Sequence, residues 1–317
     1  MVRDRPHCIW MIGLSGSGKS TIAEEYAKKY DAKVISSDKI REELYGDENI
    51  QGDPNEVFRI IHERICDLLK SGFSIIYDAT NLHLKDRRKF FNYCKDNNIQ
   101  AIHHAVVMCT PYSLCLHRNN QRKRVVPEEI IKKQLYSFNI PFFEEGFNFI
   151  TLYGWSNNFQ DIILNSQKRN ILWNEKYYRE TLNMMKNFDQ KNHHHTLDLY
   201  SHCDSVSNLV YEITDNKVLS IAGTVHDIGK LYTQKIDDNG EAYYYGHAEV
   251  GTYNLLSNLD IFNLTEDEIL ECLFYINYHM YLYSWDNEKT KEKYKKIFGE
   301  KKYHNLYTLH YADSKSK

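Results

Sequence analysis

The chain has 317 residues, of which 42% are hydrophobic and 26% are charged, and both values are typical of a folded globular protein. A chain of this length exceeds the usual size of one hydrophobic core, so two domains are expected. The sequence has no apolar run long enough to cross a bilayer and no recognisable signal peptide before His7. These features argue against a membrane-spanning protein and favour a cytoplasmic one.

The net charge and the spacing of the cysteines further limit the class of protein. The net charge of -3 argues against a general nucleic-acid binder, because such proteins often carry a clear basic excess. Lys and Arg number 22 against 20 Asp and Glu up to Ile150, and 18 against 23 beyond it. The second half is therefore acidic, which suits a metal site. The seven cysteines are scattered without zinc-ligand spacing, so we expect reduced thiols.

Segments of the first half alternate between strand and helix. An apolar, β-prone run at 7–12 leads through a glycine loop at 13–18 into helix formers at 19–30. The alternation continues with strands predicted at 33–35, 74–77 and 102–108, and with helices predicted at 40–44, 56–69 and 85–94. This order predicts a parallel α/β sheet with helices on both faces. Ligands of such sheets bind at the carboxyl ends of the strands.

The composition changes after Gly154. Residues 155–188 are rich in Asn, Gln and Lys, and from Leu197 onward the pattern predicts mainly helices. One hairpin is expected, with strands at 231–233 and 243–245 around a type I′ turn at Asn239-Gly240. The predicted organisation is an α/β domain at 1–160, a helical connection at 161–187 and an all-α domain at 188–317.

Gly13–Ser20 fits the GxxxxGK[ST] pattern between a predicted strand and a predicted helix. Such a P-loop surrounds phosphates with backbone N–H groups, while Lys19 supplies positive charge and Ser20 ligates Mg²⁺. The alternative is a glycine turn that binds no ligand. The residues expected to bind ATP or another nucleoside triphosphate are Gly13, Ser15, Gly16, Ser17, Gly18, Lys19, Ser20 and Thr21.

Three later features place polar side chains near the same sheet edge. Asp38, with Arg41 about one helical turn on, follows the second strand and can accept a proton from an alcohol. Asp78 and Asn81 follow the third strand, where a carboxylate commonly holds Mg²⁺. The basic segment 118–124 offsets charge on a transferring phosphoryl group. The alternatives are a helix cap for Asp38, a turn cap for Asp78 and a solvated helix face for 118–124.

Taken together, these residues resemble the kinase domain of phage-type polynucleotide kinases and their bacterial RNA-repair relatives, over about residues 8–154. The resemblance implies that Asp38 is the general base for a polynucleotide 5′-hydroxyl and that Arg41 contacts a phosphate of the acceptor. Arg118 and Arg122 are then lid arginines on the ATP phosphates. Asp78, Asn81 and Arg124 are expected to bind the nucleotide with its Mg²⁺. The same plan also serves kinases of small molecules and tRNAs.

The second half carries a set of potential metal ligands. These are His202, the doublet His226-Asp227, His247, His279 and Asp313. Imidazole and carboxylate groups suit Mn, Fe, Ni, Co or Mg, and a carboxylate can bridge two ions. An ordinary role remains the alternative for any single histidine, because the chain has 15 of them.

The order His, His-Asp, Asp over about residues 195–313 resembles the HD phosphohydrolase superfamily. Residues 245–251 resemble the HD domains of tRNA nucleotidyltransferases. The resemblance implies that one metal is held by His202, His226, Asp227 and Asp313. A second metal would then be offered ligands by His247 and His279. Lys230 would neutralise the charge of the substrate phosphate. Only four residues follow Asp313, so either its helix is short or the sequence has been cut there. The run 193–195 is expected to be a polar loop.

The two resemblances together imply an RNA end-healing enzyme. It would phosphorylate 5′-hydroxyl ends with ATP and remove 2′,3′-cyclic or 2′/3′ phosphates with one or two divalent metals. RNA or DNA ends are the expected substrate, and an RNA ligase is the expected downstream partner. One alternative is a nucleoside or tRNA-modifying kinase with an HD nucleotidase. Another is a regulatory module that senses nucleotides.

Overall fold

The computed structural model describes residues 5–154, 179–191, 197–256, 258, 264–285 and 287–316. The chain divides into two compact units. The first, here called the P-loop unit, comprises Met1–Gln134 and Pro141–Gly154. The second, the helical unit, comprises Leu135–Ile140 and the chain beyond Gly154. The chain therefore leaves the P-loop unit after Gln134 and returns to it at Pro141.

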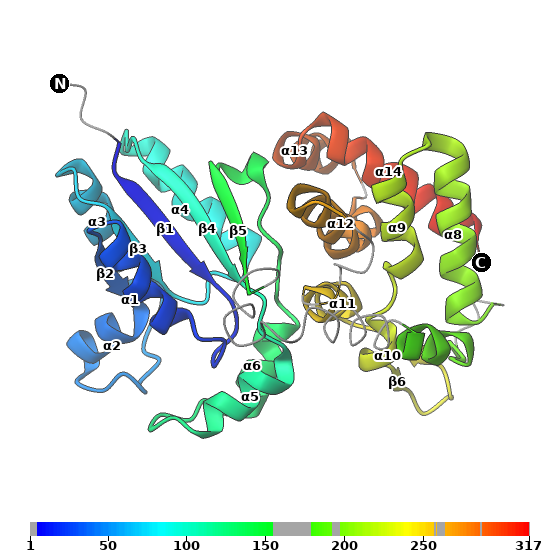
Figure 1. Ribbon diagram of the computed structural model, residues 1–317, viewed down its shortest axis with the longest axis horizontal. Coiled ribbons are helices and arrows are strands. Elements are labelled where there is room, and N and C mark those ends of the chain that lie inside the picture. Colours follow the sequence, from blue (N-terminus) through cyan, green and yellow to red (C-terminus); the bar gives the residue numbers. More distant parts are fainter. Residues whose placement is uncertain are drawn as a thin grey trace, which may run out of the picture. The chain divides into compact units, whose positions relative to one another are not determined.

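The P-loop unit contains a five-stranded, wholly parallel sheet in the order β2-β3-β1-β4-β5 (Figure 1). The strands are β1 His7–Ile12, β2 Lys33–Ser36, β3 Ile75–Asp78, β4 Ile102–Met108 and β5 Phe149–Tyr153. The helices are α1 Lys19–Lys29, α2 Ser37–Tyr45, α3 Pro54–Lys70, α4 Leu84–Asp96, α5 Tyr112–Asn120, α6 Glu128–Leu135 and the 3₁₀ helix η1 Phe143–Glu145. The predicted parallel sheet is confirmed, and β5 is a further strand that the sequence pattern had not indicated.

Alternation along β1 explains why helices cover both faces of the sheet. Ile9 and Met11 belong to a buried cluster with Ile22 and Ala23 of α1. Trp10 points to the opposite face, because successive strand residues alternate. Its ring lies 5.0 Å from that of Phe90 in α4. One apolar strand thus contributes side chains to the hydrophobic cores on both faces of the sheet, and α1 is fixed directly beyond the carboxyl end of β1.

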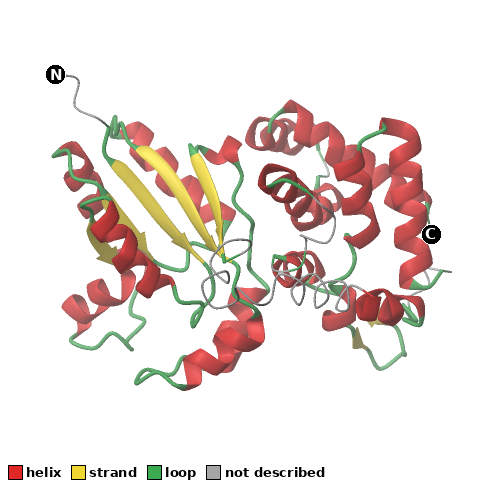
Figure 2. Cartoon of the chain, in the orientation of Figure 1, coloured by secondary structure: helices red, strands yellow, loops and turns green. Residues whose placement is uncertain are grey.

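In its described residues the helical unit contains helices and one short hairpin (Figure 2). Its elements are α8 Leu199–Thr214, α9 Lys217–Val225, α10 Lys230–Thr233, β6 Lys235–Ile236, β7 Ala242–Tyr243, α11 His247–Leu255, α12 Glu266–Tyr278, the 3₁₀ helix η3 His279–Ser284, α13 Glu288–Phe298 and α14 Glu300–Lys315. The predicted helical second half is confirmed in this sense. No described helix is long and apolar enough to cross a membrane.

The hairpin differs from the prediction in both its strands and its turn. Residues 231–233 lie in α10, and β6 is instead Lys235–Ile236, paired with β7. Gly240 has a left-handed φ of 84°, whereas Asn239 is not among the described residues with positive φ. A type I′ turn needs positive φ at both central residues, so that prediction is wrong. Asp237 Oδ1 accepts hydrogen bonds from the N–H groups of Asn239 and Glu241 and holds a longer loop.

Two other predictions about the second half have different outcomes. Either a short helix around Asp313 or a cut in the sequence was expected, and Asp313 lies in the last turn of α14, which has 16 residues. The predicted connection at 161–187 and the polar loop at 193–195 lie largely or wholly outside the described residues.

Candidate phosphate-binding and metal sites

The P-loop adopts a tight conformation between β1 and α1. Gly16 has φ 80°, and a Cβ atom there would collide with the carbonyl oxygen of Cys115, so glycine is required on two grounds. Lys19, the first residue of α1, is buried and donates from Nζ to the Leu14 carbonyl oxygen at 2.8 Å. The lysine therefore folds back over its own loop and carries its charge above the loop's N–H groups.

Ser20 and Asp78 form the neighbouring part of the site. The Ser20 hydroxyl donates to Asp78 Oδ2 at 3.0 Å, so the two predicted Mg²⁺ ligands lie side by side. Burial lowers the pKa of Lys19 and raises the pKa of Asp78. Burial therefore disfavours the charged forms of Lys19 and Asp78 in the protein alone. A bound polyphosphate with its cation would offset this free-energy cost.

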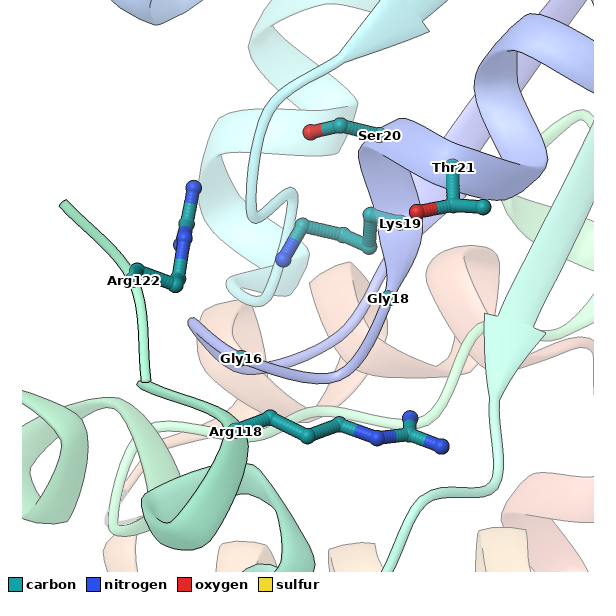
Figure 3. A pocket seen from close by; sticks show the side chains of 7 residues that line it. All are labelled: Gly16, Gly18, Lys19, Ser20, Thr21, Arg118 and Arg122. Atoms are coloured by element: carbon teal, nitrogen blue, oxygen red, sulfur yellow. The ribbon is translucent and has the colours of Figure 1, made fainter. Parts of the chain in front are cut away.

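A pocket of about 230 Å³ lies over the loop. Its lining residues are Gly16, Gly18, Lys19, Ser20, Thr21, Arg118 and Arg122. Figure 3 shows the side chains of Arg118 and Arg122 on either side of the glycine loop, with Lys19 extending from the start of α1. Glycine backbone, one lysine and two arginines around one cavity form a site for a phosphate chain.

Asn119, next to Arg118, fixes the loop that carries the other lid arginines. Its amide accepts from the Val126 N–H at 3.0 Å and donates to the Val126 carbonyl oxygen at 2.8 Å. Asn119 is only 1% exposed. The side chain thus closes residues 119–126 into a loop and presents Arg122 and Arg124 from it. In the sequence, Asn119 lies in the basic segment 118–124 with no signal of this role.

Asp38 lies one residue inside α2 and is not the cap of that helix. The cap is Ser36, whose hydroxyl accepts the Asp38 N–H. The Asp38 carboxylate instead meets Arg41 Nη1 at 3.3 Å and Arg124 Nη1 at 3.0 Å. Arg124 was expected on the nucleotide, but here it pairs with the predicted base. The two guanidinium groups therefore orient the Asp38 carboxylate at the carboxyl end of β2.

Asn81 supports the site from behind the phosphate pocket. It has a left-handed φ of 50°, and its Nδ2 donates to the carbonyl oxygens of Met11 and Tyr77. The neighbouring Thr80 carbonyl accepts the Gly13 N–H at 3.1 Å. These bonds tie the end of β3 to the start of the P-loop. Asn81 is therefore committed to backbone groups rather than to the pocket.

A buried ion pair that sequence analysis missed holds the same turn. Arg87 and Glu145 have fully buried side chains and meet through two hydrogen bonds of 2.8 Å. Arg87 Nη1 also donates to the carbonyl oxygens of Asn81 and Leu82. The two residues are 58 positions apart, so no local pattern could have linked them.

Four histidines of the helical unit share one arrangement. Each Nδ1 lies 2.7–2.8 Å from a backbone carbonyl oxygen, that of Ser316 for His202, Gly223 for His226, Tyr244 for His247 and Ile276 for His279. A carbonyl can only accept, so each Nδ1 carries a proton, and Nε2 is the ring atom left to ligate a metal. Carbonyl partners of this kind are the usual second shell of metal-binding histidines.

The four Nε2 atoms converge on Asp227 in two groups. His202 and His226 lie 3.6 and 3.4 Å from Asp227 Oδ2, and Asp313 Oδ1 lies 3.1 Å from His202 Nε2. His247 and His279 lie 3.0 and 3.5 Å from Asp227 Oδ1, and 3.1 Å from each other. All six predicted ligands are therefore together, and the two oxygens of one carboxylate face two ligand groups. This donor set fits one or two divalent transition metals.

Three further side chains hold the ligands in place. Lys230 is buried, and its Nζ lies 2.6 Å from Asp227 Oδ2 and 2.9 Å from Gln190 Oε1. Burial alone would lower the pKa of Lys230, but the Asp227 carboxylate raises it above its ordinary value. The Tyr283 hydroxyl donates to Asp313 Oδ2 at 2.7 Å. Lys230 thus holds a ligand here, and Gln190 and Tyr283 are site residues that carried no sequence signal.

Comparisons with known proteins concern the P-loop unit. Residues 8–141 match the family model described as "AAA domain". An L-seryl-tRNA(Sec) kinase of Methanococcus maripaludis is 29% identical over 144 residues, or 42% of this chain and 52% of that protein. An adenylyl-sulfate kinase of Pseudomonas aeruginosa is 33% identical over 129 residues, or 37% of this chain and 61% of that protein. Residues 8–141 form a P-loop domain of the kinase type.

Two solved structures are similar over part of the chain. The Pnkp1/Rnl/Hen1 RNA repair complex has 22% identity and a TM-score of 0.35, covering 41% of this chain and 42% of that one. A gluconokinase from Sinorhizobium meliloti has 21% identity and a TM-score of 0.31, covering 43% and 77%. The chain spans between half and two thirds of the length of the two curated kinases.

Proposed function

We propose that the P-loop unit transfers the γ-phosphoryl group of ATP to the 5′-hydroxyl of a nucleic acid, with RNA as the preferred substrate. The position of Asp38 carries this proposal. It lies beyond the carboxyl end of β2, with Arg41 and Arg124 on its two carboxylate oxygens. This arrangement provides a base for an alcohol together with positive charge for a phosphate near that alcohol.

The residues then divide the reaction between them. The P-loop N–H groups and Lys19 would bind the β- and γ-phosphates and the departing ADP, and Ser20 and Asp78 would hold Mg²⁺. Asp38 accepts the proton of the attacking 5′-hydroxyl. Arg118 and Arg122, which line the phosphate pocket, offset the charge on the transferring group. Arg124 keeps the base oriented through its ion pair.

For the helical unit we propose an HD-type phosphohydrolase that removes 2′,3′-cyclic or 2′/3′ phosphates from RNA ends. The convergence of four Nε2 atoms on the two oxygens of Asp227 carries this proposal. A divalent metal held there supplies activation of water and charge neutralisation at a phosphate. Lys230 fixes Asp227, and Tyr283 fixes Asp313. A downstream RNA ligase is the proposed partner, and the cytoplasm the proposed location.

The curated relatives favour a second candidate function. Their names describe kinases that act on seryl-tRNA and adenylyl sulfate. A kinase of a small molecule or a tRNA, combined with an HD nucleotidase, would use the same phosphate pocket. A nucleotide sensor without turnover is a third candidate, but the complete lysine, serine and carboxylate set of the P-loop favours catalysis.

One experiment separates these candidates. The full chain is incubated with ATP, Mg²⁺, Mn²⁺ and an RNA that carries a 5′-hydroxyl and a 2′,3′-cyclic phosphate, and mass spectrometry follows both ends. We expect phosphate gain at the 5′ end and loss at the 3′ end. Phosphorylation of mononucleosides in a parallel reaction, with no change at either RNA end, would favour the small-molecule kinase, and nucleotide binding without any turnover would favour the sensor.

Variants assign the two activities to their sites. Asp38→Ala is expected to lose at least 100-fold of the 5′-kinase rate, because a general base contributes on the order of 10²–10⁴, and to keep the 3′ activity. Asp227→Ala is expected to do the reverse. Loss of both activities in either folded variant would contradict separate sites.

A further inference from the structure

The segment Leu135–Ile140 has an unexpected place in the fold. In sequence it lies between α6 and β5 of the P-loop unit, yet it clusters with the helical unit. Phe138 and Ile140 are both fully buried. A largely non-helical piece of chain that buries apolar side chains must also satisfy its backbone groups, because unpaired buried N–H and C=O groups are costly.

Helix α12 supplies partners for that backbone. Asn277, fully buried, accepts the Ile140 N–H at 3.0 Å and donates to the Phe138 carbonyl oxygen at 3.0 Å. The next residue, Tyr278, donates from its hydroxyl to the Ile140 carbonyl oxygen at 2.9 Å. Three hydrogen bonds therefore join the segment to the last two residues of α12. The residue that follows is His279, one of the two histidines at Asp227 Oδ1.

Helix α11 meets the same segment at two points. Gly246, its N-cap, has φ 78°, and a Cβ atom there would lie 2.5 Å from Cδ1 of Tyr136. The rings of Phe138 and Tyr253 lie 5.2 Å apart, edge to face. Tyr136 thus packs against the residue directly before His247, the other histidine at Asp227 Oδ1.

We propose that Leu135–Ile140 is a positioning element for the His247/His279 end of the metal site. This inference rests on the proposed metal-dependent function of the helical unit. The segment contacts the chain neighbours of both histidines, and it fixes the end of one helix relative to the start of another. The 3.1 Å between the two Nε2 atoms depends on that relative placement.

The physical reason is the narrow tolerance of metal coordination. Ligand distances must hold to about 0.2 Å, and outer-shell partners typically change metal affinity by about 10- to 100-fold. The His202/His226 end draws its ligands from α8, the end of α9 and α14. Loosening Leu135–Ile140 is therefore expected to weaken one end of the site and to leave the other unchanged.

The test measures Mn²⁺ binding to the full chain by electron paramagnetic resonance. His202→Ala isolates the His247/His279 end, and His279→Ala isolates the His202/His226 end. Tyr278→Phe is added to each, because it removes only the hydroxyl and keeps the ring against Phe274 and Phe298. We expect about a tenfold loss of Mn²⁺ affinity at the His247/His279 end and no change at the other. Asn277→Ala is expected to act in the same direction and more strongly.

Thr252→Val is the matched control. Thr252 is fully buried on α11, and its hydroxyl donates to Ala248 of its own helix. It should leave Mn²⁺ affinity unchanged at both ends. Equal losses at both ends after Tyr278→Phe, or no loss at either, would overturn the positioning role while leaving the metal site intact. Absence of Mn²⁺ binding in the parent protein would instead refute the metal site itself.

Discussion

Two buried asparagines perform the same task in the two units. Asn119 bonds both backbone groups of Val126, and Asn277 bonds the Ile140 N–H and the Phe138 carbonyl. An amide side chain offers one acceptor and a donor in the geometry of a peptide group, so it can replace a missing backbone partner. In one case it shapes the loop carrying the lid arginines, and in the other it anchors a segment beside metal ligands.

At the residue scale we predict that Asn119→Leu weakens nucleotide binding. The substitution keeps the size of the side chain and removes two hydrogen bonds, each worth about 1 kcal/mol. The loop 119–126 should then hold Arg122 less firmly over the phosphate pocket. We expect about a tenfold loss of ATP affinity, measured with a fluorescent ATP analogue, and a parallel fall of the kinase kcat/KM.

The neighbouring Asn120→Leu provides the control, because Asn120 is exposed on the same turn of α5. It should leave ATP affinity within twofold of the parent value. An Asn119→Leu protein that binds ATP as tightly as the Asn120→Leu protein would show that the loop needs no such closure.

Strand β4 carries two buried histidines whose protonation makes the stability of the P-loop unit depend on pH. His103 and His104 are both buried there, and burial lowers the pKa of each to about 4. The Trp10 indole N–H donates to His103 Nδ1 at 3.2 Å, which requires a neutral ring. An unfolded histidine titrates near 6.5, so the unfolded chain binds more protons than the folded one between about pH 6.5 and 4.

At the element scale we therefore predict that the P-loop unit loses stability as the pH falls from 6.5 toward 4. Each such histidine contributes at most about 1.4 kcal/mol per pH unit to this loss. His103→Asn keeps an acceptor for Trp10 and removes the titrating group, so the loss between pH 7 and 5 should become smaller. Urea unfolding at the two pH values measures the change.

His117→Asn is the comparison variant, since His117 is exposed on α5. It should reproduce the parent's stability loss between pH 7 and 5. If His103→Asn shows the parent's loss as well, proton uptake by His103 does not contribute to acid unfolding.

At the scale of the whole molecule, a short segment of the helical unit, Leu135–Ile140, lies in sequence between two parts of the P-loop unit. The predicted boundary at residue 160 leaves Leu135–Ile140 with the P-loop unit, but its buried side chains belong to the helical unit. Gln134, directly before this segment, bonds to Ser15 of the P-loop through both its amide atoms. In sequence, the residue that bonds to the P-loop is therefore followed directly by the segment that belongs to the helical unit.

We accordingly predict that a fragment of residues 1–160 binds ATP but exposes an apolar surface. Phe138 and Ile140, each fully buried in the full chain, lose their partners on α11 and α12. The fragment should bind a hydrophobic fluorescent dye, whereas the full chain should not. Replacing both residues by serine in the fragment should abolish dye binding and retain ATP binding. A parent fragment without dye binding would show that Leu135–Ile140 finds other partners.

The sequence determined the features that depend on local pattern. Alternating apolar and helical segments predicted the parallel sheet, and the glycine, lysine and serine spacing located the phosphate site. The six potential metal ligands were also named from the sequence, through the resemblance of the His, His-Asp, Asp order to the HD superfamily. Strand β5 and the hairpin turn were missed or misassigned, since short elements carry few residues of pattern.

Only the tertiary structure decided which side chains meet across long sequence separations. The Arg87–Glu145 pair, the Arg124–Asp38 pair, the Tyr283–Asp313 bond and the Asn277 bonds to 138–140 join residues between 30 and 139 positions apart. Local propensity carries no information about such pairs, because they form when separate helices and strands pack. The sequence thus determined which chemical groups this protein has, and packing decided which of them support the groups that react.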